Sequence, residues 1–199
     1  MCSSVASPSK PEWRDRFRAY RTSLSPSQVR AKSALIDTRA AALSVVARAS
    51  TVHVYWPAIG DGEVDTRPLI QTLRGRGTTV VLPVVTSYDP ATPTMEHRRY
   101  EGRSSLSTNR WGLYEPSETP RVAPDALDAV IVPGLGADRQ GTRLGRGGGY
   151  YDAFLQDCPV PRILLTYDAC LVDALPSAPH DVPVTTIVTE RDVLMPDCA

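Results

Sequence analysis

The sequence predicts one α/β domain built on a mainly parallel sheet. Three observations lead to this prediction: a length of 199 residues, a composition of 42% hydrophobic and 22% charged residues, and an alternation of β-branched with helical segments. This balance of apolar and charged residues is typical of a globular protein and excludes a disordered chain. We therefore expect residues 1–199 to form a single domain, with the helix at its N-terminus packed on the α/β body.

The first predicted elements are two helices and a strand. Residues 10–23 carry a proline in the first turn and an apolar stripe at helical spacing, which predicts a helix. A cap at Ser25 begins a second helix that we expect to run to about Arg48. Residues 51–55 are β-branched and predict a strand. The first helix carries its apolar stripe at Trp13, Phe17, Tyr20 and Leu24 and a neighbouring basic face at Lys10, Arg14, Arg18 and Arg21.

The alternation continues along the rest of the chain. A third helix opens at Asp65 and closes at Gly75 or Gly77. Residues 86–124 are punctuated by prolines, so we expect loops there with one or two short strands. Further strands are predicted at residues 79–84, 129–132, 162–167 and 184–189, and a further helix at 148–156.

The overall charge excludes several classes of protein. Basic and acidic residues both number 22, so the formal net charge is zero and gives no electrostatic footprint for nucleic acid. No apolar run approaches the ~18 residues of a membrane span, and residues 1–10 lack the apolar core of a secretory signal. We expect a cytoplasmic monomer that binds neither nucleic acid nor membrane. The four cysteines and three histidines show no metal-ligand spacing.

The charge is unevenly distributed along the chain. Residues 1–50 contain nine basic and three acidic residues, a net charge of +6, which leaves −6 on the remainder. A basic N-terminal segment on an acidic body is either a docking arm held by ion pairs or a source of cations for an anionic ligand.

A glycine-rich segment follows the apolar run 129–132. Seven of the 13 glycines lie within residues 134–149, between a predicted strand and a predicted helix, where open α/β sheets bind ligands. Glycines allow backbone N–H groups to converge on phosphate oxygens, and the N-terminus of the next helix favours anions. Arg139, Arg143 and Arg146 add positive charge. A turn that only reverses the chain is the alternative, but seven glycines and three arginines favour anion binding.

The standard phosphate-binding patterns do not account for this segment. A Walker A loop needs a Gly-Lys pair, and the last lysine of the chain is Lys32. The dinucleotide pattern fails because Arg139 and Tyr150 occupy the positions of its third glycine.

The run 143–152, RLGRGGGYYD, resembles the signature of 5-formyltetrahydrofolate cyclo-ligases, also called methenyltetrahydrofolate synthetases. The resemblance extends over nearly the whole chain and implies a three-layer α/β sandwich related to ribose-5-phosphate isomerase and CoA-transferase folds. It also implies conversion of 5-formyltetrahydrofolate to 5,10-methenyltetrahydrofolate, with ATP and Mg²⁺ required and ADP and phosphate released. The other matching blocks are Lys10 with Arg14, and residues 63–66, 80–84, 111–116 and 180–183.

The resemblance further implies the residues of the site. Arg146 and Lys10 would be catalytic, and Asp152 and Asp181 would bind the metal. Asp138 is a competing carboxylate that we expect to order the loop instead. The nucleotide would contact Lys10, Arg14, Arg143, Leu144, Gly145, Arg146, Gly147, Gly148, Gly149, Tyr150 and Tyr151. The folate would contact Trp56, Glu63, Trp111, Arg146, Gly147, Gly148, Gly149 and Tyr150.

The chain departs from the family pattern at two places. Ala137 stands where the family commonly has an aromatic residue, and residues 86–110 match poorly, so the outer part of the pocket is unassigned. Two alternative functions remain at this point. One is a sugar-phosphate isomerase or CoA transferase of the same fold, with Glu63 as its base, and the other is a nucleotide- or folate-binding module without turnover.

Overall fold

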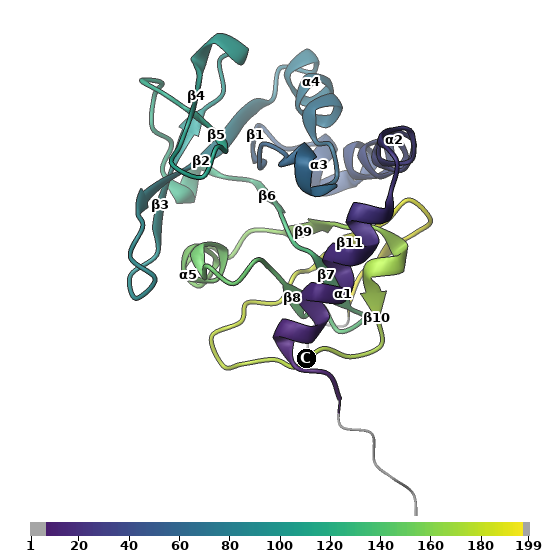
Figure 1. Cartoon of the computed structure of the whole chain (residues 1–199). Coiled ribbons are helices and arrows are strands. Elements are labelled where there is room, and N and C mark those ends of the chain that lie inside the picture. Colours follow the sequence, from purple (N-terminus) through teal and green to yellow (C-terminus); the bar gives the residue numbers. More distant parts are fainter. Residues whose placement is uncertain (1–6, 197–199) are drawn as a thin grey trace, which may run out of the picture.

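A seven-stranded sheet with strand order β12-β11-β9-β6-β1-β2-β3 organises the computed structural model, which describes residues 7–196 (Figure 1). Its five central strands are parallel, and only the two edge strands are antiparallel. The predicted mainly parallel sheet is therefore confirmed. The central strands are β1 (Thr51–His53), β2 (Thr79–Ser87), β6 (Ala129–Val132), β9 (Arg162–Leu165) and β11 (Thr186–Val188), and the edge strands are β3 (Thr94–Arg99) and β12 (Val193–Leu194).

Two smaller sheets and nine helical segments complete the described part of the chain. A three-stranded sheet contains β7 (Gly136–Asp138), β8 (Arg143–Leu144) and β10 (Leu171–Val172), and a hairpin contains β4 (Leu106–Thr108) and β5 (Tyr114–Pro116). The α-helices are α1 (Lys10–Ser23), α2 (Pro26–Ala42), α3 (Ser44–Ala47), α4 (Arg67–Gly75) and α5 (Tyr150–Leu155). The 3₁₀ helices are η1 (Ile59–Asp61), η2 (Arg103–Ser105), η3 (Pro124–Ala126) and η4 (Asp168–Cys170).

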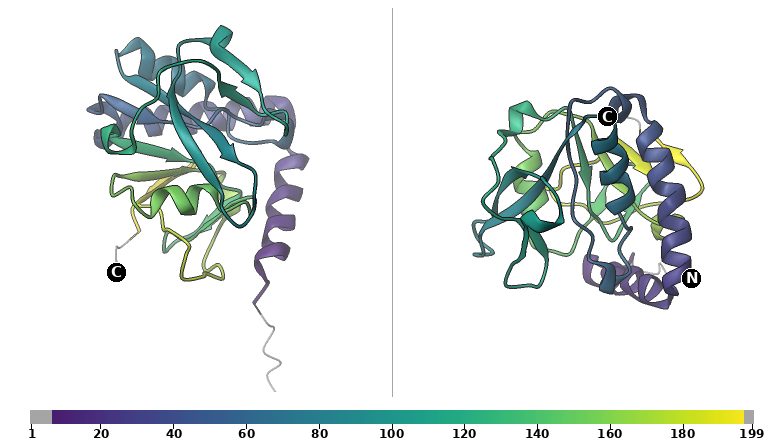
Figure 2. Two further views of the ribbon diagram at one scale, coloured as in Figure 1. Left: turned by 90° about the vertical axis from the view of Figure 1, so that its left-hand side faces the viewer. Right: turned by 90° about the horizontal axis from the view of Figure 1, so that it is seen from above.

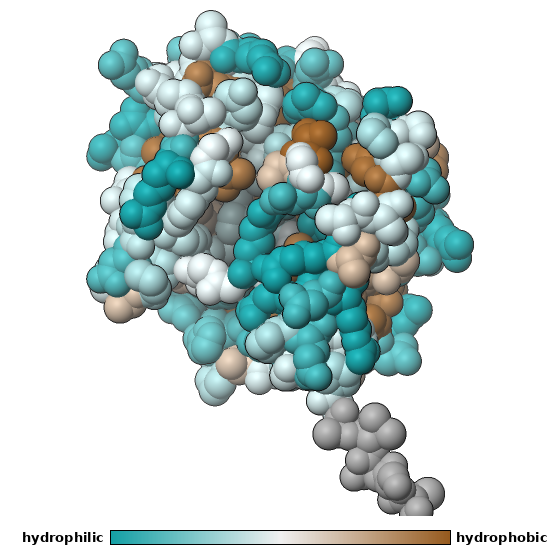
Figure 3. All heavy atoms as spheres, viewed as in Figure 1, coloured by the Kyte–Doolittle hydropathy of each residue, from teal (hydrophilic) through white to brown (hydrophobic). Residues whose placement is uncertain are grey.

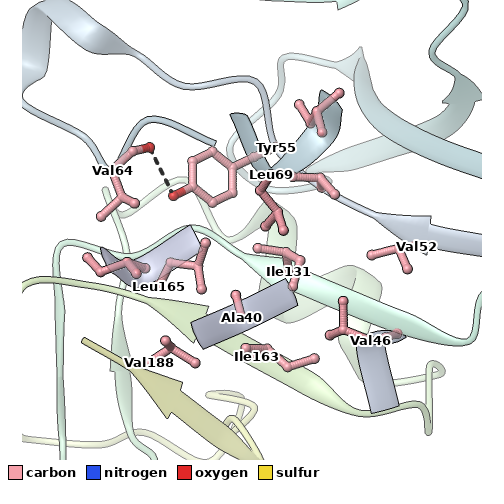
Figure 4. Close-up of a cluster of buried hydrophobic side chains, with 14 of the residues drawn as sticks. Ala40, Val46, Val52, Tyr55, Val64, Leu69, Ile131, Ile163, Leu165 and Val188 are labelled. Atoms are coloured by element: carbon pink, nitrogen blue, oxygen red, sulfur yellow. Dashed lines mark hydrogen bonds between the residues drawn. The ribbon is translucent and has the colours of Figure 1, made fainter. Parts of the chain in front are cut away.

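Helices cover both faces of the central sheet, which gives the three layers expected. Because side chains alternate along a strand, Ala129 and Ile131 of β6 face the core beneath α2 and α4, whereas Val130 and Val132 face the core beneath α5. Figure 4 shows Ile131 packed beside residues of α2 and neighbouring strands, and Figure 2 shows α2 and α4 on the side of the sheet opposite α5.

Several predicted element boundaries are wrong. The second helix stops at Ala42 rather than about Arg48, because Leu43 adopts an extended conformation and packs against the core before the short α3 begins. Strand β1 ends at His53. Residues 86–124, expected to hold one or two short strands, hold the end of β2 and three further strands: β3 pairs with β2, and β4 pairs with β5. Among residues 7–196, none of the helices has the length and hydrophobicity of a membrane span.

Helix α1 packs tightly against the start of the glycine-rich segment. Phe17 is 3% exposed, and a Cβ atom added to Gly136 would lie 2.5 Å from its ring and also collide with the carbonyl oxygen of Cys170. Only glycine fits at position 136, because any Cβ atom there would be closer to these atoms than van der Waals contact allows.

We expect Gly136→Ala to lower the free energy of unfolding by about 1–3 kcal/mol, the usual cost of overpacking a core. Urea unfolding followed by circular dichroism measures this change. Gly60→Ala is the control, because a Cβ there has open space around it. Equal stability of the two variants would contradict the prediction.

Asp37 on α2 is a buried acid, 5% exposed. Within residues 7–196 neither of its carboxylate oxygens has a hydrogen-bond partner. Burial, with the nearby charge of Asp65, raises the pKa of Asp37 to about 8. An unfolded aspartate has a pKa of about 3.9, so between these values the folded state holds a proton that the unfolded state lacks. Protonated Asp37 therefore contributes to the free energy of unfolding below the unfolded pKa, and this contribution is lost as the pH rises through about 8.

We expect Asp37→Asn to remove this loss, because asparagine carries no titrating proton. The variant should gain stability relative to the unmodified protein by up to about 1.4 kcal/mol per pH unit as the pH rises from 5 to 8. Urea unfolding at three pH values tests this, with the exposed Asp157→Asn as control. Parallel pH profiles for the Asp37 variant and the unmodified chain would contradict it.

Candidate functional site

The glycine-rich loop after β6 and the loop after β1 lie together beyond the carboxyl ends of these strands. Helix α1 runs across both, and its contacts reach η1 and η4. Figure 3 shows hydrophilic side chains gathered over the lower half of α1 and the neighbouring β7–β8 segment, beside a hollow in the surface. This is the topological position at which open α/β sheets bind ligands.

Arg146 connects the glycine-rich loop to the loop after β1. Its guanidinium lies 2.5 Å from Asp61 Oδ2 and 3.6 Å from Glu63 Oε1. Glu63 is buried, and its other oxygen accepts a hydrogen bond from the backbone of Ala58 at 2.9 Å. Burial opposes the charge on Arg146, but Glu63 and Asp61 outweigh it and raise the pKa of the guanidinium. The sequence reasoning included Arg146 and Glu63 and missed Asp61.

A second arginine lies underneath this contact. Arg21 is 1% exposed, donates a hydrogen bond to the carbonyl oxygen of Gly134, and places a nitrogen 4.0 Å from Glu63. It therefore ties α1 to the beginning of the glycine-rich segment and supplies a fixed positive charge behind Glu63. The spacing on α1 placed Arg21 on the basic face but gave no signal for this role.

Lys10 and Arg14, one helical turn apart on α1, reach the same region. Arg14 Nε donates to the carbonyl oxygen of Gly145 at 3.0 Å, and Lys10 Nζ lies 2.5 Å from Asp181 Oδ2. The structure therefore brings these two predicted cations to the glycine-rich loop and to the loop before β11. Gly147 and Gly149 have φ angles of 102° and 72°, a conformation that favours glycine.

The two predicted metal ligands, Asp152 and Asp181, lie on segments that contact each other. The backbone N–H of Val182 donates to Asp152 Oδ1 at 3.3 Å, which brings Asp152 beside the residue that follows Asp181. Arg143 pairs with Asp152 at 2.6 Å. Burial would raise the pKa of Asp181, but hydrogen bonds from Lys10 and the backbone of Ala178 lower it, so this carboxylate stays ionised.

This donor set can be tested against Mg²⁺. Within residues 7–196 no cluster of three His, Cys, Asp or Glu side chains forms a complete metal cage. Mg²⁺, however, usually takes one or two carboxylates together with phosphate oxygens and water. Asp152 and Asp181 therefore fit a magnesium ion bound with a nucleotide, and they do not fit an independent metal centre.

Arg143 and Leu144 are more buried than the prediction of nucleotide contact suggested. The Arg143 side chain is 4% exposed and Leu144 is 2% exposed. Their direct contact with nucleotide stays a prediction, while the geometry shows Arg143 anchoring Asp152. Asp138 accepts hydrogen bonds from the backbones of Gln140 and Thr142, which is the loop-ordering role expected of it.

The two consecutive tyrosines have different surroundings. Tyr150 donates to the carbonyl oxygen of Ser87 at 2.9 Å, and its ring centre lies 5.8 Å from that of Trp111. Trp111 is 47% exposed and also packs edge-on against Tyr88 at 4.7 Å. These rings form an open aromatic wall, in which Tyr88 was not predicted because residues 86–110 lacked a family match.

Tyr151 instead contacts the interior. Its hydroxyl lies 3.0 Å from His53 Nε2, and His53 Nδ1 lies 3.2 Å from His97 Nδ1. Burial lowers the pKa of His97 to about 4 and holds that of His53 well below its ordinary value, so both rings are neutral at neutral pH. This pair of histidines holds Tyr151 in place at the first turn of α5.

Trp56, another predicted site residue, belongs to a separate aromatic cluster. Its ring packs against Tyr100, with centres 5.5 Å apart, and against Tyr114 at 6.3 Å. It lines a groove beside α4, and among residues 7–196 its aromatic ring contacts, Tyr100 and Tyr114, lie outside the glycine-rich loop.

The chain is similar to known proteins over nearly its whole length. The model of the 5-formyltetrahydrofolate cyclo-ligase family matches residues 6–190. The 5-formyltetrahydrofolate cyclo-ligase of Escherichia coli K12 is 34% identical over 182 residues, covering 89% of this chain and 98% of the relative. The Haemophilus influenzae protein of the same name is 30% identical and covers 88% and 94%. The NMR structure of Aquifex aeolicus 5,10-methenyltetrahydrofolate synthetase matches with a TM-score of 0.82 at 28% identity, covering 96% and 94%.

Proposed function

The chain belongs to the 5-formyltetrahydrofolate cyclo-ligase family and is an enzyme of this type, and we propose that its glycine-rich loop binds the ATP that drives ring closure. The observation that carries the proposal is the meeting of Arg14 and Arg146 at this loop, with Lys10 paired to Asp181 and Asp152 bonded to the backbone of the next residue, Val182. Cations around a glycine-rich backbone suit a triphosphate, and carboxylates on two segments that contact each other suit its magnesium ion.

The chemistry explains why a phosphate site is needed. A formamide carbon is a poor electrophile, and closing the ring requires the formyl oxygen to leave. That oxygen attacks the γ-phosphorus of ATP, the bond from phosphorus to the bridging oxygen breaks, and ADP departs. The secondary amine at N10 of the folate then attacks the activated carbon. Phosphate leaves with the former formyl oxygen, N10 loses its proton, and 5,10-methenyltetrahydrofolate remains.

The protein contributes mainly positioning and charge neutralisation, as in other phosphoryl transfers. Backbone N–H groups of residues 145–149 bind phosphate oxygens, and Lys10 and Arg14 approach from α1. Arg146 exchanges its contacts with Asp61 and Glu63 for the transferred phosphoryl group and so holds it beside the formyl oxygen. Asp152 and Asp181 would hold Mg²⁺, which neutralises phosphate charge when bound.

The folate occupies the other side of the loop in this proposal. Glu63 accepts hydrogen bonds from the pteridine N–H groups, and Trp111 with Tyr150 offers flat surfaces against which aromatic rings pack. Trp56 contacts the part of the folate that is farther from the reacting atoms. When Arg146 releases Glu63, Arg21 keeps a positive charge near that carboxylate.

A spectroscopic assay tests the proposal. Purified protein with 5-formyltetrahydrofolate, ATP and Mg²⁺ should produce the near-ultraviolet absorption band of methenyltetrahydrofolate, accompanied by one ADP per product. Omitting ATP or Mg²⁺ should abolish the band. A folded protein that forms the band without nucleotide would contradict the assignment of the glycine-rich loop to ATP.

A further inference from the structure

A second concave surface lies beside α4, away from the glycine-rich loop. It is a groove of about 420 Å³ between α4 and the segment that follows β3. Its walls combine two aromatic rings, Trp56 and Tyr100, with three arginines, Arg67, Arg74 and Arg103. Figure 1 shows α4 and the β4–β5 hairpin, which flank this region, at the top of the molecule. Aromatic surface beside cations suits a ligand that has a flat ring and a negatively charged end.

The three arginines of the groove differ in whether their positive charge is already paired with a carboxylate. Arg67 is paired with Asp65 at 2.6 Å. Arg74 lies over the ring of Tyr100 at 5.1 Å and donates to a backbone carbonyl oxygen at 3.2 Å. Arg103 lies 5.7 Å from the ring centre of Tyr114. Among the residues that the structure describes, neither Arg74 nor Arg103 forms an ion pair, so both guanidinium groups are available to an anionic ligand.

The groove is connected to the proposed folate site through Trp56. Trp56 precedes Ala58, whose backbone N–H binds Glu63, and Glu63 in turn faces Arg146. Trp56 also packs against Tyr114, which belongs to the same hairpin region as the exposed Trp111. A ligand held at Glu63 and Trp111 can therefore extend past Trp56 toward the arginines.

A folate substrate has both an aromatic ring that can pack against Trp56 and negative charges that can bind the arginines of the groove. A folate consists of a pteridine, a benzoyl ring and a terminal glutamate with two carboxylates that are ionised at neutral pH. Resting on the proposed function, we propose that the groove is the subsite for the glutamate end of 5-formyltetrahydrofolate. Arg74 and Arg103 bind its carboxylates, and Trp56 with Tyr100 contacts the benzoyl ring.

The test compares two substrates in the same cyclisation assay: 5-formyltetrahydrofolate and 5-formyltetrahydropteroate, which lacks the glutamate. The unmodified protein should show a KM about tenfold lower for the glutamate-bearing substrate, which corresponds to one charge-assisted hydrogen-bonded pair. Arg74→Gln and Arg103→Gln should each bring the ratio of the two KM values toward one, with similar kcat. Arg30→Gln, an exposed arginine on α2, should leave the ratio unchanged.

The outcomes separate this inference from the proposed function. Equal KM values for the two substrates with the unmodified protein would overturn the glutamate subsite and leave the cyclisation intact. Variants that raise both KM values by the same factor would also overturn it, because they would show a general effect on the folate site. Absence of product from both substrates would overturn the proposed function and, with it, the subsite.

Discussion

Arg146→Ala should lower kcat by about 10³-fold, in the range expected when a positioned donor is removed from a developing negative charge. The guanidinium belongs to the loop that we propose binds phosphate, and it pairs with Asp61 and Glu63 of the loop after β1. The substitution should leave the fold intact, because the Arg146 side chain is 44% exposed. The buried Glu63 would still accept its hydrogen bond from the backbone of Ala58 and would still lie near the charge of Arg21. Steady-state assays with circular dichroism measure activity and folding together.

Arg139→Ala is the matched control for this variant. Arg139 belongs to the same glycine-rich segment, is 58% exposed and lies 3.6 Å from the exposed Asp173, so its loss should change kcat by less than about threefold. Arg146→Lys retains the charge without the forked donor and should recover part of the activity. Similar losses for Arg139→Ala and Arg146→Ala would show that overall positive charge, and not the position of Arg146, is what matters.

The second large effect is expected at Asp181, one of the two proposed metal ligands. Asp181→Asn should raise the Mg²⁺ concentration needed for half-maximal activity by about 100-fold, because an amide oxygen carries no charge for the metal. Its stability should change little, since the partner Lys10 is 24% exposed and can be hydrated. A magnesium titration of the rate measures the shift, with the fully exposed Asp173→Asn as control. An unchanged magnesium requirement would remove Asp181 from the metal site.

Asp152→Asn should differ from Asp181→Asn in one respect. Its partner Arg143 is 4% exposed, so removing the carboxylate leaves a buried charge without its counter-ion. Breaking such a pair costs about 3–5 kcal/mol, and we expect Asp152→Asn to lose that stability as well as activity. Thermal unfolding of the two variants side by side distinguishes the roles of these carboxylates.

Local patterns account for what was predictable in this protein. The bounds of α1 follow from its N-terminal proline and a capping box between Ser9 and Glu12, and β6 follows from a four-residue apolar run buried on both faces. The strands β7, β8, β10 and β12 were missed because two or three residues are too short to show a period. Their stability comes from partners that are distant in the sequence.

The α/β class, the glycine-rich loop and the charged residues of the family signature can all be predicted before folding is considered, because each is a pattern of neighbouring residues. Which charges meet depends on the three-dimensional fold. Asp61 lies 85 positions from Arg146, and Gly134 lies 113 positions from Arg21, and no spacing rule relates residues so far apart. The fold also turned Trp56 toward α4, because the direction of a side chain after a strand depends on the elements packed around it.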